Sequence, residues 1–295
     1  MKKYYLLINP KGGHKKGLEI FEKVKPVFLD SKVDLTVLHT EYAGHAFDYA
    51  NTLDFTNYDG LCAIGGDGTM YEMINGMLKR NDEKTIPIGL ITGGTGNSFM
   101  YDVNCIDPVE AAERIVKYNL RPLDIAKVNA NGKIFYAFNI VGWGLATDAG
   151  KLAEKLRWLG GIRYDVASII EVLKGKNRIA SLTIDNKTIK ENFIFIIGCN
   201  TIHTGKAMKM APLAKLDDGK IDLIIVRKTS KLKLLKLFPK LFSGDHIKSP
   251  LVQYKQVKNF SITLEDTNDL TIDGEIIGTT PLHVQMLPKL LNVLV

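Results

Sequence analysis

The 295-residue chain has few cysteines and no long apolar segment. Its three cysteines, Cys62, Cys105 and Cys199, are far apart and form no Cys-x-x-Cys pair, so free thiols are favoured over a zinc site or a disulfide framework. No stretch approaches the roughly 18 apolar residues of a membrane-spanning helix, and the first apolar run is too short for a signal peptide. We therefore expect a cytoplasmic protein that meets lipid only as a peripheral contact at a membrane surface.

Acidic residues are the minority among the charges, with 32 Asp and Glu against 39 Lys and Arg. The net charge of +7 favours anionic partners, such as nucleotide phosphates or a membrane surface, without selecting among them. Hydrophobic residues form 45% of the chain and charged residues 24%, which indicates a folded globular protein long enough for two domains. No nucleic-acid partner is expected, and the sequence leaves the oligomeric state open, a homodimer included.

Glycine, in contrast, is concentrated in three turns, of which Gly65–Thr69 is the central one. It lies between a buried strand at 58–64 and apolar residues at helical spacing from Met70 to Leu78. Such a turn directs backbone N–H groups and the positive end of a helix dipole into one pocket, and glycine lets a ligand approach the backbone. The pattern predicts a phosphate cradle, with a Mg²⁺ ion or a substrate hydroxyl between Asp67 and the phosphates. The alternative is a tight turn whose aspartate bonds to its own backbone.

Strands and helices alternate over residues 1–125. Predicted strands cover 4–8, 33–38, 58–64 and 86–91. The alternation predicts a parallel sheet with helices on both faces, in which ligands bind at the carboxyl ends of the strands. The other two glycine turns, at 9–13 and 93–97, also follow strands, so all three turns are expected along one edge of an α/β nucleotide-binding domain.

From about residue 126 the pattern changes to short apolar runs joined by turns. Asn131-Gly132 and Asp218-Gly219 are typical of β-hairpins. We expect a β-rich, sandwich-like domain over 126–295, interrupted by helices near 148–174 and 230–242, with the last residues returning to the first domain. Its predicted strands include 123–128, 134–141, 179–184, 193–197, 221–226, 260–264, 270–273 and 283–287.

The predicted helix near 230–242 is both amphipathic and basic. Its leucines and phenylalanines are interleaved with Lys231, Lys233, Lys236 and Lys240. Such a helix can lie on an anionic membrane, although lysines of this kind more commonly form only a solvated face.

Five motifs occur in order along nearly the whole chain. They are Asn9-Pro10-x-x-Gly13, Gly65-Gly66-Asp67-Gly68-Thr69, Gly94-Thr95-Gly96-Asn97, Asp217-Asp218-Gly219-x-x-Asp222 and Asp273-Gly274-Glu275. Together they resemble the diacylglycerol kinase catalytic-domain family, which includes bacterial diacylglycerol kinases, sphingosine kinases and ceramide kinases. The central motif alone is shared with NAD kinases, whereas the first and fourth motifs favour a lipid kinase.

The resemblance implies an ATP- and Mg²⁺-dependent enzyme that phosphorylates the hydroxyl of diacylglycerol or a related lipid alcohol. Three alternatives stay open: a sphingosine, long-chain-base or ceramide kinase-like activity, an NAD kinase-like activity on a soluble substrate, and a non-catalytic nucleotide- or lipid-binding regulator. In the family the glycine turns and a threonine after the second strand bind the nucleotide. The matching residues are Asn9, Pro10, Lys11, Gly12, Gly13, Thr40, Gly66, Asp67, Gly68, Thr69, Met70, Tyr71, Glu72 and Thr95.

The resemblance also implies catalytic residues. Glu275 matches the family's proton acceptor for the lipid hydroxyl, whereas the residues alone favour a hairpin turn with an exposed glutamate beside it. In the sphingosine-kinase branch the aspartate of the central loop often takes the role of base. The division of labour between Asp67 and Glu275 is therefore open.

A metal site follows from the fourth motif. Asp218, with the backbone carbonyls of Lys215 and Lys220, matches the family's second Mg²⁺ site, and hard cations take oxygen ligands of this kind. The motif alone is a common turn, so the metal depends on the resemblance.

Two aspartates match substrate or site residues of the family. The segment around Trp143 resembles the sphingosine-kinase branch, as does Ser98, which stands where bacterial diacylglycerol kinases have an acid. The resemblance implies that Asp148 contacts the substrate's polar head, whereas an aspartate at a helix start is usually an N-cap. Asp124 matches an aspartate near the site, and a structural hydrogen-bond acceptor is the alternative.

Overall fold

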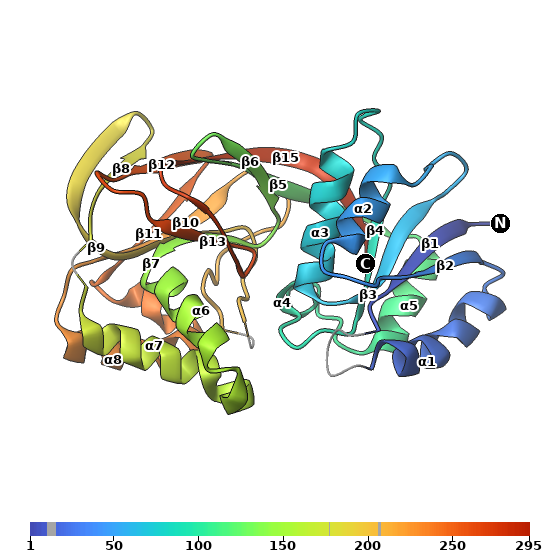
Figure 1. The fold of residues 1–295 in the computed structure, drawn as a ribbon, viewed down its shortest axis with the longest axis horizontal. Helices are drawn as coiled ribbons and strands as arrows, with labels where there is room; N and C mark the ends of the chain where they lie inside the picture. Colours follow the sequence, from blue (N-terminus) through green and yellow to red (C-terminus); the bar gives the residue numbers. More distant parts are fainter. Residues whose placement is uncertain (11–15, 177, 206–207) are drawn as a thin grey trace. The chain divides into compact units, whose positions relative to one another are not determined.

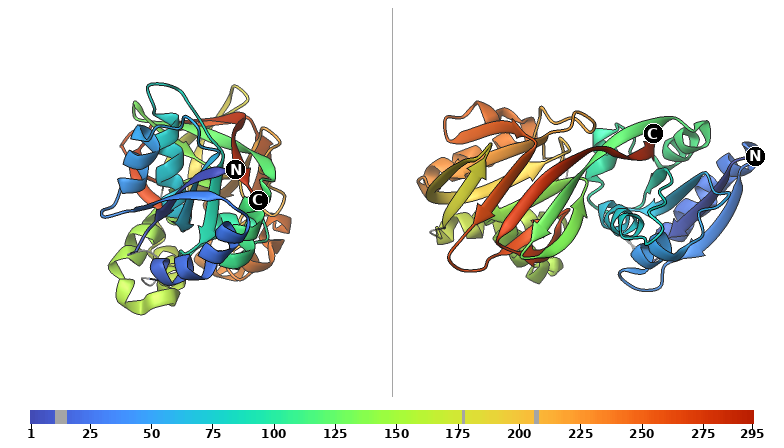
Figure 2. Two further views of the ribbon diagram at one scale, coloured as in Figure 1. Left: turned by 90° about the vertical axis from the view of Figure 1, so that its right-hand side faces the viewer. Right: turned by 90° about the horizontal axis from the view of Figure 1, so that it is seen from above.

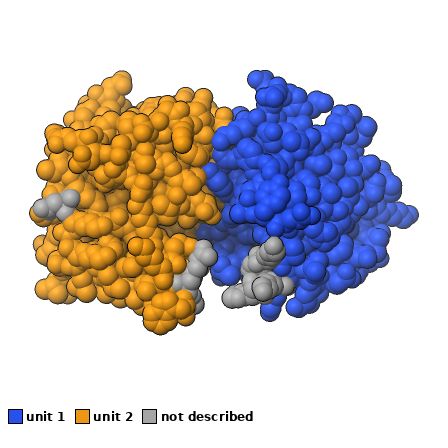
Figure 3. Space-filling model, in the orientation of Figure 1, with its two compact units in different colours: residues 1–125, 288–295 blue, residues 126–287 orange. Residues whose placement is uncertain are grey.

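The computed structural model describes residues 1–10, 16–176, 178–205 and 208–295. They form two compact units, which Figure 3 distinguishes by colour. Unit 1 comprises residues 1–125 and 288–295, and unit 2 comprises residues 126–287. Two strands, β5 (Leu120–Ala130) and β15 (Leu282–Leu294), carry the chain from one unit to the other.

Unit 1 is a parallel sheet covered by helices (Figures 1 and 2). Its elements are β1 (Lys3–Ile8), α1 (Gly17–Asp30), β2 (Asp34–His39), α2 (His45–Thr52), β3 (Gly60–Gly65), α3 (Asp67–Leu78), β4 (Ile88–Thr92), α4 (Ser98–Asp102) and α5 (Pro108–Lys117). The strands lie in the order β4, β3, β1, β2, and the end of β15 joins β4 in parallel. Helix α1 packs on α5, and α2 packs on α3. The predicted α/β fold is confirmed.

The composition of the strands explains this arrangement. Both β3 and β4 are buried along their whole length, as parallel strands with helices on both faces must be. Helix α1 turns Val24 and Phe28 into the core and continues through Pro26 to Asp30.

Unit 2 is a β-rich unit of antiparallel strands. Besides most of β5 and part of β15, its elements are β6 (Lys133–Ala137), β7 (Ile140–Gly144), α6 (Leu145–Lys155), the 3₁₀ helix η2 (Arg157–Ile162), α7 (Arg163–Lys174), β8 (Ile179–Ile184), β9 (Lys187–Cys199), β10 (Ile221–Arg227), α8 (Lys231–Leu237), α9 (Lys240–Ser243), the 3₁₀ helix η3 (Asp245–Lys248), β11 (Val252–Val257), β12 (Asn259–Thr263), β13 (Asp269–Ile272) and β14 (Glu275–Thr279). The first half of β9 pairs with β8 and its second half with β7 and β10. Strand β9 therefore belongs to two sheets. The predicted β-rich domain is confirmed.

Several predicted elements differ from the structure. The strand predicted at 134–141 is two strands, β6 and β7, because the N–H groups of Phe138 and Asn139 bond to the carboxylate of Asp273. The helix predicted near 230–242 is two short helices that meet at Pro239, which cannot donate an intrahelical hydrogen bond. Strands β11 and β14 were not predicted. Among the residues described, none of the helices combines the length and the apolar character required to cross a bilayer.

Candidate functional site

The first candidate nucleotide-binding residues lie at the ends of the parallel strands in unit 1. The N–H of Asn9, directly after β1, donates to the carbonyl of Ile64 in β3 at 3.3 Å. Beyond β2, the N–H of Thr40 donates to the carbonyl of Ile8 at 2.9 Å, and its side chain is buried. These bonds hold Asn9 and Thr40 on one edge with the end of β3. The candidates Lys11, Gly12 and Gly13 lie outside the described residues.

The central glycine turn leads directly from β3 into α3. Gly66 is the N-cap, and as a glycine it has no side chain to accept a hydrogen bond from the first turn of α3. The N–H groups of the first helical turn, on Asp67, Gly68 and Thr69, have no intrahelical acceptor. With the positive end of the helix dipole, they form a site suited to a phosphate group.

The second and third glycine turns are packed against each other. The N–H of Gly93 donates to the carbonyl of Gly65 at 2.7 Å. A Cβ added to Gly94 would lie 2.6 Å from Cα of Gly66, so neither loop has room for a side chain there. The Asn97 side chain closes the third turn, because it accepts from the N–H of Gly94 at 3.1 Å and donates to the Gly94 carbonyl at 2.8 Å. The glycines are therefore required by loop packing as well as by ligand approach.

The carboxylate of Asp67 links these two loops. It accepts hydrogen bonds from the N–H groups of Ser98 at 2.7 Å and Phe99 at 3.1 Å, at the start of α4. Burial raises the pKa of Asp67, and the two backbone hydrogen bonds oppose the shift. The alternative in which this aspartate bonds to its own turn is wrong, because its partners belong to the next loop.

Two residues expected at the nucleotide have structural contacts. The side chain of Met70 is fully buried, and its N–H donates to the carbonyl of Gly66 at 3.1 Å. The carboxylate of Glu72 accepts from the N–H groups of Gly44 at 2.9 Å and Ala46 at 3.2 Å, and so caps α2. Met70 and Glu72 therefore support the loop, and their contact with the nucleotide stays a prediction.

The other two nucleotide candidates of these loops are more accessible. Thr95 is exposed in the third turn, and Tyr71 is partly exposed in the first half of α3. Both side chains are therefore accessible to a bound nucleotide.

Asp124 has a structural partner at the end of unit 1. Its side chain is fully buried, and it accepts a hydrogen bond from the N–H of Lys289 at 2.6 Å. Lys289 adopts a left-handed conformation with φ of 51°. The aspartate thus fixes the returning segment of β15, as the structural alternative for Asp124 requires.

Glu275 follows a tight hairpin in unit 2. Asp273 and Gly274 have φ values of 50° and 90°, as in a type I′ turn, and Ile272 pairs directly with Glu275. The buried carboxylate of Asp273 accepts three hydrogen bonds of 2.8–2.9 Å from the N–H groups of residues 138–140. The hairpin is therefore anchored to the start of β7, with Glu275 exposed beside the turn.

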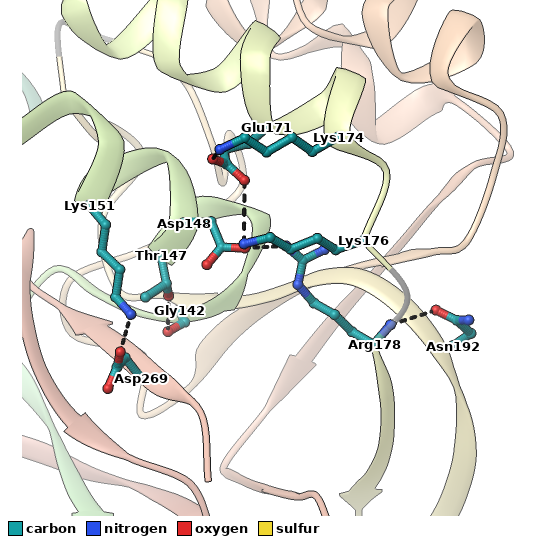
Figure 4. Close-up of polar contacts among 10 residues, drawn as sticks. All are labelled: Gly142, Thr147, Asp148, Lys151, Glu171, Lys174, Lys176, Arg178, Asn192 and Asp269. Atoms are coloured by element: carbon teal, nitrogen blue, oxygen red, sulfur yellow. Dashed lines mark hydrogen bonds and ion pairs between the residues drawn. The ribbon is translucent and has the colours of Figure 1, made fainter. Parts of the chain in front are cut away.

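Asp148 lies in the first half of α6 within a network of charges (Figure 4). Its carboxylate pairs with Nζ of Lys176 at 2.7 Å and with the guanidinium of Arg178. Although burial opposes the shift, hydrogen bonds from these two cations lower the pKa of Asp148. The N-cap of α6 is Gly144, so the N-cap interpretation of Asp148 is wrong.

A pocket of about 210 Å³ in unit 2 adjoins this network. It is lined by Trp143, Gly144, Asp148, Lys151, Arg178 and residues 267–269. Lys151 pairs with Asp269 on one side, and Asp148 pairs with Arg178 on the other (Figure 4). The indole N–H of Trp143 is buried and has no hydrogen-bond partner among the described residues. A buried donor without a partner is uncommon in proteins.

The turn at Asp218 contains oxygen atoms that could be ligands of a metal ion. Its carboxylate accepts from the N–H of Lys220 at 3.0 Å, and Gly219 has a φ of 73°. Over the ranges described, no three His, Cys, Asp or Glu side chains are grouped to hold a metal ion. A cation here would therefore need the backbone carbonyls of Lys215 and Lys220 in addition to Asp218.

A second carboxylate adjoins this turn. Asp222 is fully buried, and one of its oxygens accepts from Tyr254 at 2.5 Å and Gln256 at 3.1 Å. Its other oxygen has no hydrogen-bond partner in the part of the chain that is described. Burial raises the pKa of Asp222, and the charge of Asp218 raises it further. Neighbouring carboxylates and carbonyl groups fit a hard cation such as Mg²⁺, which takes oxygen ligands.

Two residues of these sites were missed in the sequence. Arg178 was not identified because its partner Asp148 is 30 residues away along the chain. Asn97 was noted only as part of a motif, and its φ of 51° explains why asparagine suits that position.

Comparisons with known proteins agree with this organisation. The diacylglycerol kinase catalytic domain family matches residues 3–128, and the YegS C-terminal NAD kinase beta sandwich-like domain family matches residues 139–295. A diacylglycerol kinase from Bacillus subtilis is 28% identical over 95% of this chain and 92% of its own length. Sphingosine kinase 1 from Arabidopsis thaliana is 30% identical over 88% of this chain, which spans 64% of that relative. The crystal structure of a diacylglycerol kinase from Bacillus anthracis superposes with a TM-score of 0.81, at 25% identity, over 99% of this chain and 96% of the other.

The matched proteins belong to one class of enzyme, the lipid kinases. Within that class, the chain belongs to the diacylglycerol kinase catalytic-domain family.

Proposed function

We propose that this protein transfers the γ-phosphate of ATP to the hydroxyl of a lipid alcohol, and that diacylglycerol is the preferred acceptor. One observation carries the proposal: α3 begins at a glycine N-cap beside the glycine turn at 93–97, at the carboxyl ends of parallel strands. Ligands of open α/β sheets bind at this edge, and a helix start of this kind suits phosphate oxygens.

In the proposed reaction the bond between the γ-phosphorus and its bridging oxygen breaks as the acceptor oxygen bonds to the phosphorus. The acceptor proton passes to a carboxylate, and we assign this role to Glu275 rather than Asp67. The reason is that both oxygens of Asp67 accept hydrogen bonds from backbone N–H groups, whereas Glu275 is exposed at a rigid hairpin. Bound Mg²⁺ would neutralise phosphate charge.

The choice of acceptor rests on the charges around Asp148. An ammonium group, such as that of a long-chain base, would require a carboxylate with excess negative charge. Asp148 is already balanced by Lys176 and Arg178. If the pocket beside it receives the polar head, a neutral glycerol head fits better, because its oxygens can accept hydrogen bonds from the cations.

The test incubates the protein with labelled ATP, Mg²⁺ and diacylglycerol, sphingosine, ceramide or NAD, and separates the products by thin-layer chromatography. Labelled phosphatidic acid is the expected main product. Labelled NADP without labelled lipid would refute the lipid kinase, and a preference for sphingosine would refute the choice of acceptor.

The role of Glu275 is tested with Glu275→Gln. We expect kcat to fall by at least about 10²-fold, as for loss of a general base, with little change in ATP binding. Glu265→Gln is the matched control, because Glu265 is also an exposed glutamate of unit 2. Unchanged turnover in Glu275→Gln would remove the assignment.

A further inference from the structure

Exposed apolar side chains are concentrated on α7, α8 and the segments next to them in unit 2. They are Trp158, Ile162, Ile169, Leu173, Leu232 and Phe242, and we call them and the lysines of α8 and α9 the α7–α8 surface. Trp158 is 78% exposed and Leu232 is 73% exposed. Monomeric proteins rarely leave such groups together in water, so a partner for this surface is expected.

The apolar groups follow the geometry of the helices. Ile169 and Leu173 are four residues apart, a spacing that places them on one face of α7, and Ile162 is the N-cap residue of that helix. The ammonium of Lys231 donates to the carbonyl of Leu173, which joins the end of α7 to the start of α8. Helix α8 buries Leu234 and Leu237 and turns Leu232 outwards. Leu232 is therefore not needed for the core of unit 2.

The charge of this surface is strongly positive. From Lys228 to Lys240 the chain has five lysines and no Asp or Glu. Of the two acidic residues of α7, Asp165 and Glu171, Glu171 is only 3% exposed and pairs with Lys174. Lysines beside exposed tryptophan and leucine match a membrane surface, where anionic headgroups lie above acyl chains.

We propose that the α7–α8 surface docks on a bilayer that contains anionic lipids. The lysines contact the headgroups, and Trp158, Leu232 and Phe242 enter the interface below them. This goes beyond the proposed reaction, since it identifies where unit 2 meets the membrane that holds a lipid acceptor.

The test is flotation with vesicles of phosphatidylcholine, with or without about 30% phosphatidylserine, in the absence of ATP. The wild-type protein is expected to bind the anionic vesicles. Lys233→Glu combined with Lys236→Glu should weaken binding by about tenfold or more, because each lysine near an anionic surface contributes about 1 kcal/mol. Trp158→Ala combined with Leu232→Ala should weaken it by about fivefold or more, since apolar area is lost.

The matched control is Lys255→Glu combined with Lys258→Glu, which makes the same change in net charge at exposed lysines of another part of unit 2. Its binding should stay within about twofold of wild type. An equal loss in both charge variants, or no binding by the wild type, would overturn the proposal. A dimer in analytical ultracentrifugation that Trp158→Ala with Leu232→Ala abolishes would also overturn it, in favour of a second copy of the chain.

Failure of docking is distinguishable from failure of the proposed function. All variants are assayed with a short-chain diacylglycerol that needs no membrane. Docking variants should keep this activity while they lose vesicle binding. Loss of the short-chain activity in both docking variants, with folding intact, would assign these residues to catalysis and refute the docking surface.

Discussion

The packing of the two glycine loops makes a quantitative prediction for Gly94→Ala. The new Cβ would lie 2.6 Å from Cα of Gly66 and 2.8 Å from the side-chain oxygen of Asn97, whereas ordinary contacts are 3.4–4 Å. The loops would have to separate by about 1 Å, because backbone atoms on one side leave no flexible side chain to move. Overpacking of this size costs about 1–3 kcal/mol of stability.

The same displacement should affect the nucleotide more than the fold. A misplacement of about 1 Å at a reacting group reduces rates by about 10²-fold, so we expect kcat/KM for ATP to fall by that order. Steady-state kinetics at varied ATP measures it, and calorimetry with a non-hydrolysable ATP analogue measures binding separately. Gly205→Ala is the matched control, because a Cβ at Gly205 would meet none of the described residues within 4 Å.

Two results would refute this reasoning. Wild-type stability and kinetics in Gly94→Ala would mean that the two loops are not in close contact. A lower melting temperature with unchanged ATP binding would mean that the loops are in contact but lie away from the nucleotide.

Three further outcomes follow from hydrogen bonds and charges. Glu72→Ala should lower the free energy of unfolding, measured in urea, by about 1–2 kcal/mol, because the cap of α2 is lost. Glu72→Gln should lower it by less, and equal losses in the two variants would contradict the cap. The pKa of Asp148 in the folded protein is below its ordinary value of 3.8. Its ion pairs therefore stabilise the fold at a pH above 3.8, and this stabilisation is lost as the pH falls through the pKa of the folded state. Asp148→Asn should therefore be less stable near neutrality and lose less stability on acidification, and an acid response equal to wild type would refute the ion pairs. Millimolar Mg²⁺ should raise the melting temperature of wild type and of Asp217→Asn, whereas an equal rise in Asp218→Asn would remove the metal site.

The sequence predicts the architecture well because its strongest signals are local. Buried apolar runs followed by glycine turns define β3 and β4, and Asn131-Gly132 and Asp273-Gly274 form the hairpins that such pairs favour. The elements that were missed depend on distant partners. The division of 134–141 into two strands depends on a carboxylate about 135 residues later, which no local pattern contains.

The candidate site was predictable as a set of positions, and less so as a set of roles. The motif around Asp67 indicates that an acid stands at the start of α3. Its bonds to residues 98 and 99 require knowledge of how two loops pack. The charge balance at Asp148 was likewise invisible, because Lys176 and Arg178 reach it from beyond the end of α7.

Three of the candidate aspartates share one physical feature, which is that their carboxylates accept hydrogen bonds from backbone N–H groups. Asp67 holds two at the start of α4, Asp124 one on the returning segment, and Asp273 three before β7. Removing such a carboxylate leaves buried donors unpaired at about 1–3 kcal/mol each, so an alanine variant would lose activity whether or not the acid takes part in chemistry. Asparagine keeps one acceptor oxygen but cannot take a proton. A base at Asp67 would therefore lose kcat in Asp67→Asn at unchanged ATP affinity, whereas a loop-holding Asp67 would retain much of both.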